Sequence, residues 1–439
     1  MGLLVICIAI VFMIFGYHNF RTLANPVTVF NGAWVLCLTC CEYFIFEYDA
    51  YKVSFRMYLF ILISIIVFSC TILFYRSKIW GVNANNLIEW QETDDCINYR
   101  LIIIFNIIAF LVLLPFLKSS IAEMQATSLV NVRANRMLGS GTEFVWQTII
   151  KNVFVFPVYL STIYIAIDAF VFGYSKHRWK LIALAFIDAI MYTITYLGRL
   201  MIIQVLLFVA LTYCFYRLSA FYFQSEKIKT MLKKVKRVTL LLMIIAIMAL
   251  IIITGQRKSN NSYGIFYTVV TYFGGSVKFC DIELQLVDRA NEFTWGGGLF
   301  SGFWDYILMV IQRFFGIDFL RPQEIIGVYN GDIASIGGGM VMTAFATIIL
   351  NMYVDGGVWG IVVDSVFLAV IAMYFLKKMY IYPDCRHRLL ATQMLMIISS
   401  CALHWEGNRI TAFAVFFFFV LFVSSKYGVK ITIGKFRIL

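Results

Sequence analysis

Arg199 draws attention first, because a guanidinium group stands here inside a long apolar stretch. It follows Gly198 within residues 181–223, which are otherwise largely apolar. An arginine at bilayer depth costs roughly 2.5 to 3.5 kcal/mol on insertion scales, so it normally faces a polar cavity or an anionic partner. Two interpretations stay open: a side chain that extends to the membrane interface, and a contact to a lipid-borne phosphate.

A second basic group, residues 254–261, emerges directly from an apolar run. Its sequence is Thr-Gly-Gln-Arg-Lys-Ser-Asn-Asn, with the arginine at position 257. Guanidinium and amide groups can bind phosphate oxygens and sugar hydroxyls. The alternative is simply the solvated start of a loop.

A third feature combines glycines with a carboxylate. Residues 337–339 are three glycines before an apolar segment, and such a run lets backbone N–H groups approach an anion at a helix N-terminus. Asp355 follows Tyr353 and precedes two further glycines. Its carboxylate is a candidate general base, or else the N-cap of the next helix.

Motifs for several kinds of catalytic centre are absent. The sequence has no phosphate-binding P-loop, no dinucleotide fingerprint, no H-E-x-x-H and no G-x-S-x-G. Asp281 and Glu283 form a D-x-E pair, for which solvation is favoured over a metal site. Cys37, Cys40 and Cys41 lie in an apolar run and are interpreted as buried packing residues. We therefore predict no metal and no cofactor.

These residues must be positioned by membrane-embedded helices. Of the 439 residues, 62% are apolar and only 14% are charged, and the mean hydropathy is +0.84. This composition excludes a soluble enzyme and a disordered chain. The net charge of +12 is carried by short basic groups between apolar runs, which is typical of membrane loops. The lipid bilayer is thus an expected partner, and nucleic acid is not.

We predict an all-α, polytopic integral membrane protein with about 11 (10–12) transmembrane helices. The N-terminal run has no basic segment and no cleavage site, so it is interpreted as an uncleaved first span. No internal repeat or linker divides the chain, so residues 1–439 are expected to form a single polytopic domain. The predicted spans are residues 2–17, 27–46, 57–75, 101–117, 152–172, 181–197, 200–223, 238–254, 358–376, 389–404 and 411–424.

Lysine and arginine predict the orientation of these spans. The basic groups at residues 176–180, 227–237, 377–388 and 426–437 all lie inside if residues 340–353 do not cross the membrane. We therefore predict a re-entrant or interfacial helix over residues 340–353 on the outer side. Residues 255–357 then form one large extracytoplasmic loop, with another helix against the membrane at residues 298–316. In the outer loops arginines outnumber lysines, which favours bidentate binding of phosphate or acidic sugar.

The order of these features resembles the Wzy-type O-antigen and capsular oligosaccharide repeat-unit polymerases of bacteria. The similarity includes the Gly198-Arg199 pair at the outer end of two spans and Arg257 just after a later span, followed by the large outer loop. It also includes the run from the glycines at 337–339 through Thr343 to Asp355, although Gly356 replaces the family's phenylalanine. The resemblance covers residues 196–360 well and the first five spans only by hydropathy.

The resemblance implies transfer of a glycan from undecaprenyl pyrophosphate onto the next lipid-linked repeat unit, at the outer face of the cytoplasmic (inner) membrane. It also implies a GT-C-like fold, and a chain-length regulator and a flippase as partners. Guanidinium groups can stabilise a pyrophosphate leaving group without metal. The expected catalytic residues are Arg199, Arg257 and Asp355, with Asp332 or Asp281 as a reserve base. The expected substrate contacts are Lys278, Arg313, Arg321, Tyr329, Thr343, Tyr353, His404 and Arg409.

Two other functions compete with this interpretation. An O-antigen ligase has similar topology, but ligases usually carry a histidine in the large outer loop, and residues 255–357 contain none. A lipid-linked oligosaccharide flippase or other transporter would also place charges within the membrane, but transporters tend to show repeated halves. The polymerase is the interpretation that we favour.

Overall fold

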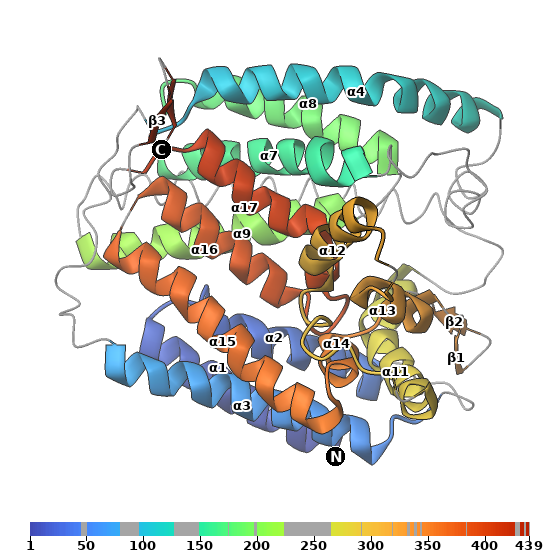
Figure 1. The fold of residues 1–439 in the computed structure, drawn as a ribbon. Coiled ribbons are helices and arrows are strands. Elements are labelled where there is room, and N and C mark those ends of the chain that lie inside the picture. Colours follow the sequence, from blue (N-terminus) through green and yellow to red (C-terminus); the bar gives the residue numbers. More distant parts are fainter. Residues whose placement is uncertain are drawn as a thin grey trace. The chain divides into compact units, whose positions relative to one another are not determined.

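The computed structural model shows a predominantly α-helical chain (Figure 1). It describes residues 1–44, 51–79, 96–126, 149–173, 175–196, 200–223, 265–290, 292–317, 319–331, 334–337, 340–342, 345–382, 384–425, 431–433 and 436–438. The chain divides into two compact units. Unit 1 contains Met1–Asn86, Tyr263–Lys377 and Met394–Phe413, and unit 2 contains Leu87–Ser262, Lys378–Gln393 and Ala414–Leu439.

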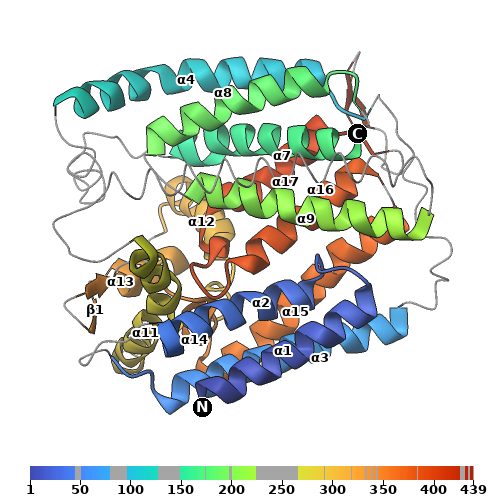
Figure 2. The same ribbon diagram turned by 180° about the vertical axis from the view of Figure 1, so that it is seen from behind.

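Unit 1 is built on an N-terminal group of helices. Helices α1 and α3 both pack against α2, and the three lie side by side in both views (Figures 1 and 2). The Asn25 side chain accepts a hydrogen bond from the Thr28 N–H, and Pro26 occupies the first turn, so the start of α2 is well capped. The elements of this group are α1 (Gly2–Phe20), α2 (Pro26–Thr39), the π-helical turn η1 (Cys40–Phe44) and α3 (Phe55–Ile79).

The rest of unit 1 comes from the second half of the chain. Helix α11 packs against α2, η1 and α14. The elements are α11 (Ile265–Ala290), α12 (Ser301–Phe315), α13 (Pro322–Gly331), β1 (Ala334–Gly337), β2 (Met340–Met342), α14 (Ile348–Val354), most of α15 (Gly357–Ile381), η4 (Glu406–Asn408), and parts of α16 (Cys385–Ser399) and α17 (Ile410–Phe422).

Unit 2 is a second helical group, in which α7 packs against α4, α8 and α9. The Asn106 amide donates to Thr162 Oγ1 at 2.9 Å, so a polar pair is satisfied between the apolar helices α4 and α7. The rings of Tyr164 and Phe208 stack at 4.1 Å. The elements are α4 (Tyr99–Ala126), η3 (Lys151–Val155), α7 (Phe156–Phe172), α8 (Arg178–Tyr196), α9 (Leu200–Phe223), β3 (Ile431–Ile433) and β4 (Phe436–Ile438), with the remainder of α15, α16 and α17.

In the part of the chain that the structure describes, six helical segments are long and apolar enough to cross a membrane, so the chain is a multi-pass membrane protein. They are Gly2–Phe20, Phe55–Arg76, Tyr99–Lys118, Lys151–Phe172, Met201–Leu218 and Gly357–Ile381. Four other predicted spans correspond to α2 with η1, α8, α16 and α17, which are helical but do not meet the same limits of length and composition. The predicted span at residues 238–254 lies outside the described residues.

The expected helix over residues 340–353 is not one helix. Strand β2 pairs with β1 in an antiparallel register, and the helical part is α14, only 7 residues long. A two-residue connection that contains glycine is typical of a hairpin, and glycines occupy the two positions between these strands. At 1.5 Å per residue α14 extends about 10 Å, far less than the ~30 Å of hydrocarbon, so it cannot cross.

Four segments with predicted cytoplasmic positions are linked by contacts within unit 2. Arg388 forms a buried ion pair with Asp168 at 2.6 Å, and Arg386 donates to the Val423 carbonyl at 2.7 Å. The Ser424 N–H donates to the Cys96 carbonyl at 2.7 Å, and the rings of Tyr99 and His177 stack at 4.7 Å. Residues near 98, 177, 386 and 424 therefore lie at one end of unit 2, as the predicted orientation requires.

Candidate functional site

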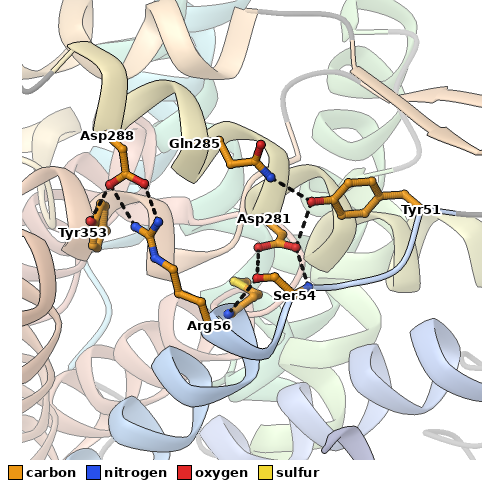
Figure 3. A network of polar contacts seen from close by, with 8 residues as sticks. Tyr51, Ser54, Arg56, Asp281, Gln285, Asp288 and Tyr353 are labelled. Carbon is orange, nitrogen blue, oxygen red and sulfur yellow. Dashed lines mark hydrogen bonds and ion pairs between the residues drawn. The ribbon is translucent and has the colours of Figure 1, made fainter.

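Segments that the sequence places outside the membrane meet within unit 1. Residues 51–56 come just before or at the start of α3, Asp281 and Asp288 lie on α11, and Tyr353 lies on α14. Figure 3 shows their side chains pointing toward one another in two adjoining groups of polar contacts. We call this set the α11 network. Its members are Tyr51, Ser54, Arg56, Asp281, Gln285, Asp288 and Tyr353.

The first group surrounds the buried carboxylate of Asp281. Ser54 donates to it twice, from its hydroxyl at 2.6 Å and from its backbone N–H at 2.7 Å. The Tyr51 hydroxyl donates at 3.0 Å and accepts in turn from the Gln285 amide at 3.1 Å. Burial, together with the nearby Asp281 carboxylate, raises the pKa of Tyr51 to about 12. Asp281 therefore fixes residues 51–54 against α11.

The second group is centred on Asp288. The Arg56 guanidinium donates to both carboxylate oxygens, one bond measuring 2.9 Å, and the Tyr353 hydroxyl donates to one of them at 2.6 Å. The guanidinium also lies over the rings of Phe60 and Tyr353, 5.1 and 4.9 Å from their centroids. Hydrogen bonds from Arg56 lower the pKa of Asp288, and burial, with the bond to Asp288, raises that of Tyr353 to about 12.

Asp355 lies nearby in the sequence but has a different set of partners. Its buried carboxylate accepts hydrogen bonds from the Thr294 hydroxyl and from three backbone N–H groups, those of residues 296, 298 and 299, at 3.0, 2.6 and 2.8 Å. All four donors belong to residues 293–299, which we call the Trp295 loop. With four donors already bound, the carboxylate is placed to hold this loop in position.

The glycines of the Trp295 loop are required by this geometry. Gly296 has φ +98°, a conformation that residues with a side chain rarely adopt. A Cβ on Gly298 would lie 2.8 Å from the Asn351 carbonyl and 2.9 Å from Asp355 Oδ1. The Thr-Trp-Gly-Gly-Gly run at 294–298 is not among the predicted site residues, although it contains three consecutive glycines like those at residues 337–339.

A set of buried amide and hydroxyl groups lies next to the Trp295 loop. The Asn351 amide donates to the Gly298 carbonyl at 2.8 Å and also to the Asn408 side chain. The Ser301 hydroxyl bridges Asn408 at 2.8 Å and Gln323 at 2.9 Å. These bonds connect α14, α12 and α13 with the turn at η4, so the loop has a rigid base.

His404 and Arg409, two predicted substrate contacts, flank η4 and share one carboxylate. Glu406 Oε1 lies 3.5 Å from Arg409 Nη1 and 3.9 Å from His404 Nε2. The His404 ring packs 5.9 Å from that of Phe345. Glu406 is thus a further buried carboxylate near predicted binding residues, and no sequence motif singles it out.

The remaining predicted residues have different environments. Arg321 bonds to Asp305 at 3.1 Å and to Glu324 at 2.6 Å, and its bond lowers the pKa of Glu324. Lys278 and Tyr329 are buried on α11 and α13. Arg313 belongs to α12, whereas Arg199, Arg257, Asp332 and Thr343 lie outside the described residues.

No group of three or more potential metal ligands occurs in the part of the chain that the structure describes. The site instead offers carboxylates, amides, paired guanidinium groups and aromatic rings, a set suited to hydroxyl-rich ligands. Comparison with models of protein families, with curated proteins and with solved structures gave no match, so a functional assignment depends on the sequence pattern and on this geometry.

Proposed function

We propose that this chain is an oligosaccharide repeat-unit polymerase of the bacterial cytoplasmic membrane. In this proposal it has a GT-C-like arrangement of spans and transfers a glycan from undecaprenyl pyrophosphate to the next lipid-linked repeat unit, at the outer face. The resemblance described above supplies the reaction. The multi-pass helical architecture supports the proposal, because it places the chain in the membrane that holds a lipid-linked substrate.

One structural observation supports the proposal in addition to the resemblance. Four segments that the topology places outside, near residues 51–56, 281–299, 351–355 and 404–409, are joined by side-chain contacts within unit 1. Buried hydrogen-bonded networks hold such segments rigidly, and rigid polar surfaces are suited to orienting a sugar substrate. We assign this surface to the sugar and Arg199 and Arg257 to the pyrophosphate.

The hydrogen bonds made by the carboxylates indicate which of them could act as the general base. The carboxylate of Asp355 already accepts four hydrogen bonds and that of Asp281 three, so both favour holding roles over proton transfer. Glu406 lies beside His404 and Arg409 and is the carboxylate that we assign to the acceptor hydroxyl.

The test is a polymerisation assay with the purified protein in nanodiscs. Undecaprenyl-pyrophosphate-linked repeat units from the strain that encodes the chain are supplied, and longer lipid-linked chains are sought. We expect ladders from the unmodified protein, none from Arg199→Ala or Arg257→Ala, and normal ladders from the control Arg289→Ala, which removes an exposed arginine on α11. Full ladders from Arg199→Ala would refute the assigned role of Arg199.

The same assay separates the competing functions. A flippase, or a ligase supplied without its acceptor, makes no longer lipid-linked chains from this substrate. Glu406→Gln should lower the rate and remove the acidic limb of its pH profile, because a general base is inactive when protonated, whereas Asp355→Asn should lower the rate without changing the shape of that profile.

A further inference from the structure

Trp295 presents a large aromatic surface to solvent. Its side chain is 80% exposed, the highest value for any tryptophan among the described residues. Its φ of +49° is a left-handed conformation, which is uncommon for residues with a bulky side chain. Strained conformations of this kind persist only where the surrounding structure holds them, and they concentrate at binding and catalytic sites.

The loop that carries Trp295 is held from both sides of this residue. Thr294 donates from its backbone to the Val354 carbonyl at 2.9 Å and from its hydroxyl to Asp355. Gly296, next after the tryptophan, donates its N–H to the same carboxylate at 3.0 Å. Because the backbone is fixed immediately before and after position 295, the indole ring is held outward at little further cost in entropy.

The segment that carries Trp295 also contains an exposed carboxylate. Its exposed neighbours in sequence are Glu292 and Gly296. The ring of Phe293 lies next to it, with the two ring centroids 5.6 Å apart. An exposed aromatic ring with a carboxylate three positions away in the sequence suits a ligand with both an apolar face and hydroxyl groups.

We propose that Trp295 is a stacking platform for a pyranose ring of the glycan substrate. The axial C–H groups of a pyranose form an apolar face that packs on the electron-rich face of an indole ring, and the neighbouring Glu292 carboxylate can accept hydrogen bonds from the sugar hydroxyls. Asp355 acts here as a positioning residue, because it holds the loop and does not itself contact the sugar. The identity of the ligand depends on the proposed function, but its binding can be measured without turnover.

The test uses tryptophan fluorescence of the full chain in nanodiscs. Emission that disappears in Trp295→Phe is attributed to Trp295, and Trp359→Phe is the matched control because Trp359 is 77% exposed on the candidate span α15. Iodide is the aqueous quencher, brominated phosphatidylcholine is the lipid quencher, and the probe is the oligosaccharide released from the lipid-linked repeat unit by mild acid.

We expect iodide to quench the Trp295 emission and the oligosaccharide to protect it, while brominated lipid quenches the Trp359 emission. Quenching of Trp295 by brominated lipid without protection by the sugar would overturn the proposal and identify a lipid-facing tryptophan. Absence of protection, whichever quencher acts, would also overturn it. If the oligosaccharide protects Trp295 but no polymer forms in the polymerisation assay, the sugar site stands and the polymerase is refuted. If polymer forms but Trp295 is not protected, only the sugar site is refuted.

Variants at position 295 separate binding from folding. Trp295→Asn and Trp295→Gly remove the ring but accept a positive φ readily, so the thermal midpoint should stay the same or rise. Their affinity for the oligosaccharide should fall about tenfold, and Trp295→Tyr should recover most of it. A drop in thermal stability that accompanies the loss of affinity in Trp295→Asn would show a structural role and overturn the proposal.

Discussion

At Asp355 a single carboxylate supplies the acceptors that the backbone of a glycine-rich loop lacks. Oδ1 accepts from Thr294, Gly296 and Gly298, and Oδ2 accepts from Leu299. Backbone N–H groups that are buried without a partner cost about 1–3 kcal/mol each, so the loop depends on this one side chain. The sequence motif alone is compatible with Asp355 as a general base or as a structural residue. Its hydrogen bonds favour the structural role.

This dependence predicts an order of stability for variants of Asp355. Asp355→Ala removes both acceptor oxygens, and with them all four hydrogen bonds, and should lower the free energy of unfolding by about 2–4 kcal/mol. Asp355→Asn retains Oδ1 but turns an N–H₂ group toward the Leu299 N–H, so its loss should be smaller. Unfolding in mixed SDS micelles, followed by circular dichroism, measures both. The control Glu324→Gln, at an exposed pair, should cost under about 1 kcal/mol. Equal stability of Asp355→Ala and the unmodified protein would contradict this interpretation.

Tyr51 predicts a loss of stability at alkaline pH. Its pKa is raised from 10.0 to about 12 in the folded protein, chiefly by burial. A raised pKa stabilises the fold fully below the unfolded value and no longer does so once the pH has risen through the folded value. The contribution of Tyr51, about 1 kcal/mol after solvent screening, should therefore disappear between about pH 10 and pH 12.

The comparison of Tyr51→Phe with the unmodified protein isolates this effect from other alkaline titrations. Their difference in unfolding free energy should change across that pH interval. Ser54→Ala, which removes a donor to the same carboxylate without removing an ionisable group, should lower stability equally at each pH. A pH-independent difference for Tyr51→Phe would contradict the assignment.

At the scale of elements, hydropathy and amphipathic periodicity predict most helices because they depend on neighbours along one chain segment. The helix expected over residues 298–316 is confirmed as α12, and six of the expected spans are present as long apolar helices. Residues 340–353 show the limit of this method. Short apolar runs do not distinguish a strand followed by a short helix from one helix, and the hairpin depends on pairing with β1.

Contacts between segments that are distant in the sequence also explain why the sequence alone does not predict the whole candidate site. Arg56 and Asp288 are 232 positions apart, and nothing local in either segment specifies their pairing. Asp355 was recognised from its motif, but its partners in the Trp295 loop lie 56 to 61 positions away. Sequence patterns therefore identify candidate residue types and predict a side of the membrane, whereas tertiary packing decides which groups meet.

Helix α12 has an apolar stripe that predicts contact with lipid. The exposed residues Phe303, Trp304, Ile307, Val310 and Phe314 recur at helical spacing, while Asp305 is buried and bonds to Arg321. A nitroxide attached at Val310→Cys should collide more with oxygen than with a water-soluble nickel complex. A label at the polar position Glu324→Cys on α13 should show the reverse. Higher nickel accessibility at Val310 would contradict an interfacial helix.

At the scale of the whole molecule, the orientation of the chain in the membrane determines on which side the proposed reaction takes place. Within unit 1, contacts join the segments with predicted outer positions, and within unit 2 they join segments with predicted cytoplasmic positions. Lysine and arginine in short loops favour the cytoplasm, so the ends carrying Lys176 and Lys377 are expected inside. This arrangement requires that residues 340–354 do not cross, in agreement with the 7 residues of α14.

Cysteine labelling tests this orientation directly. In a background where the exposed Cys7 and Cys70 are replaced by alanine, Gly327→Cys adds a side chain where a Cβ meets open space. We expect a membrane-impermeant maleimide to label Gly327→Cys in intact spheroplasts, and to label Lys176→Cys and Lys377→Cys only after permeabilisation. Labelling of Lys377→Cys from outside would require an additional crossing before α15. It would move the α11 network to the cytoplasmic side, where an outer-face polymerase could not use it.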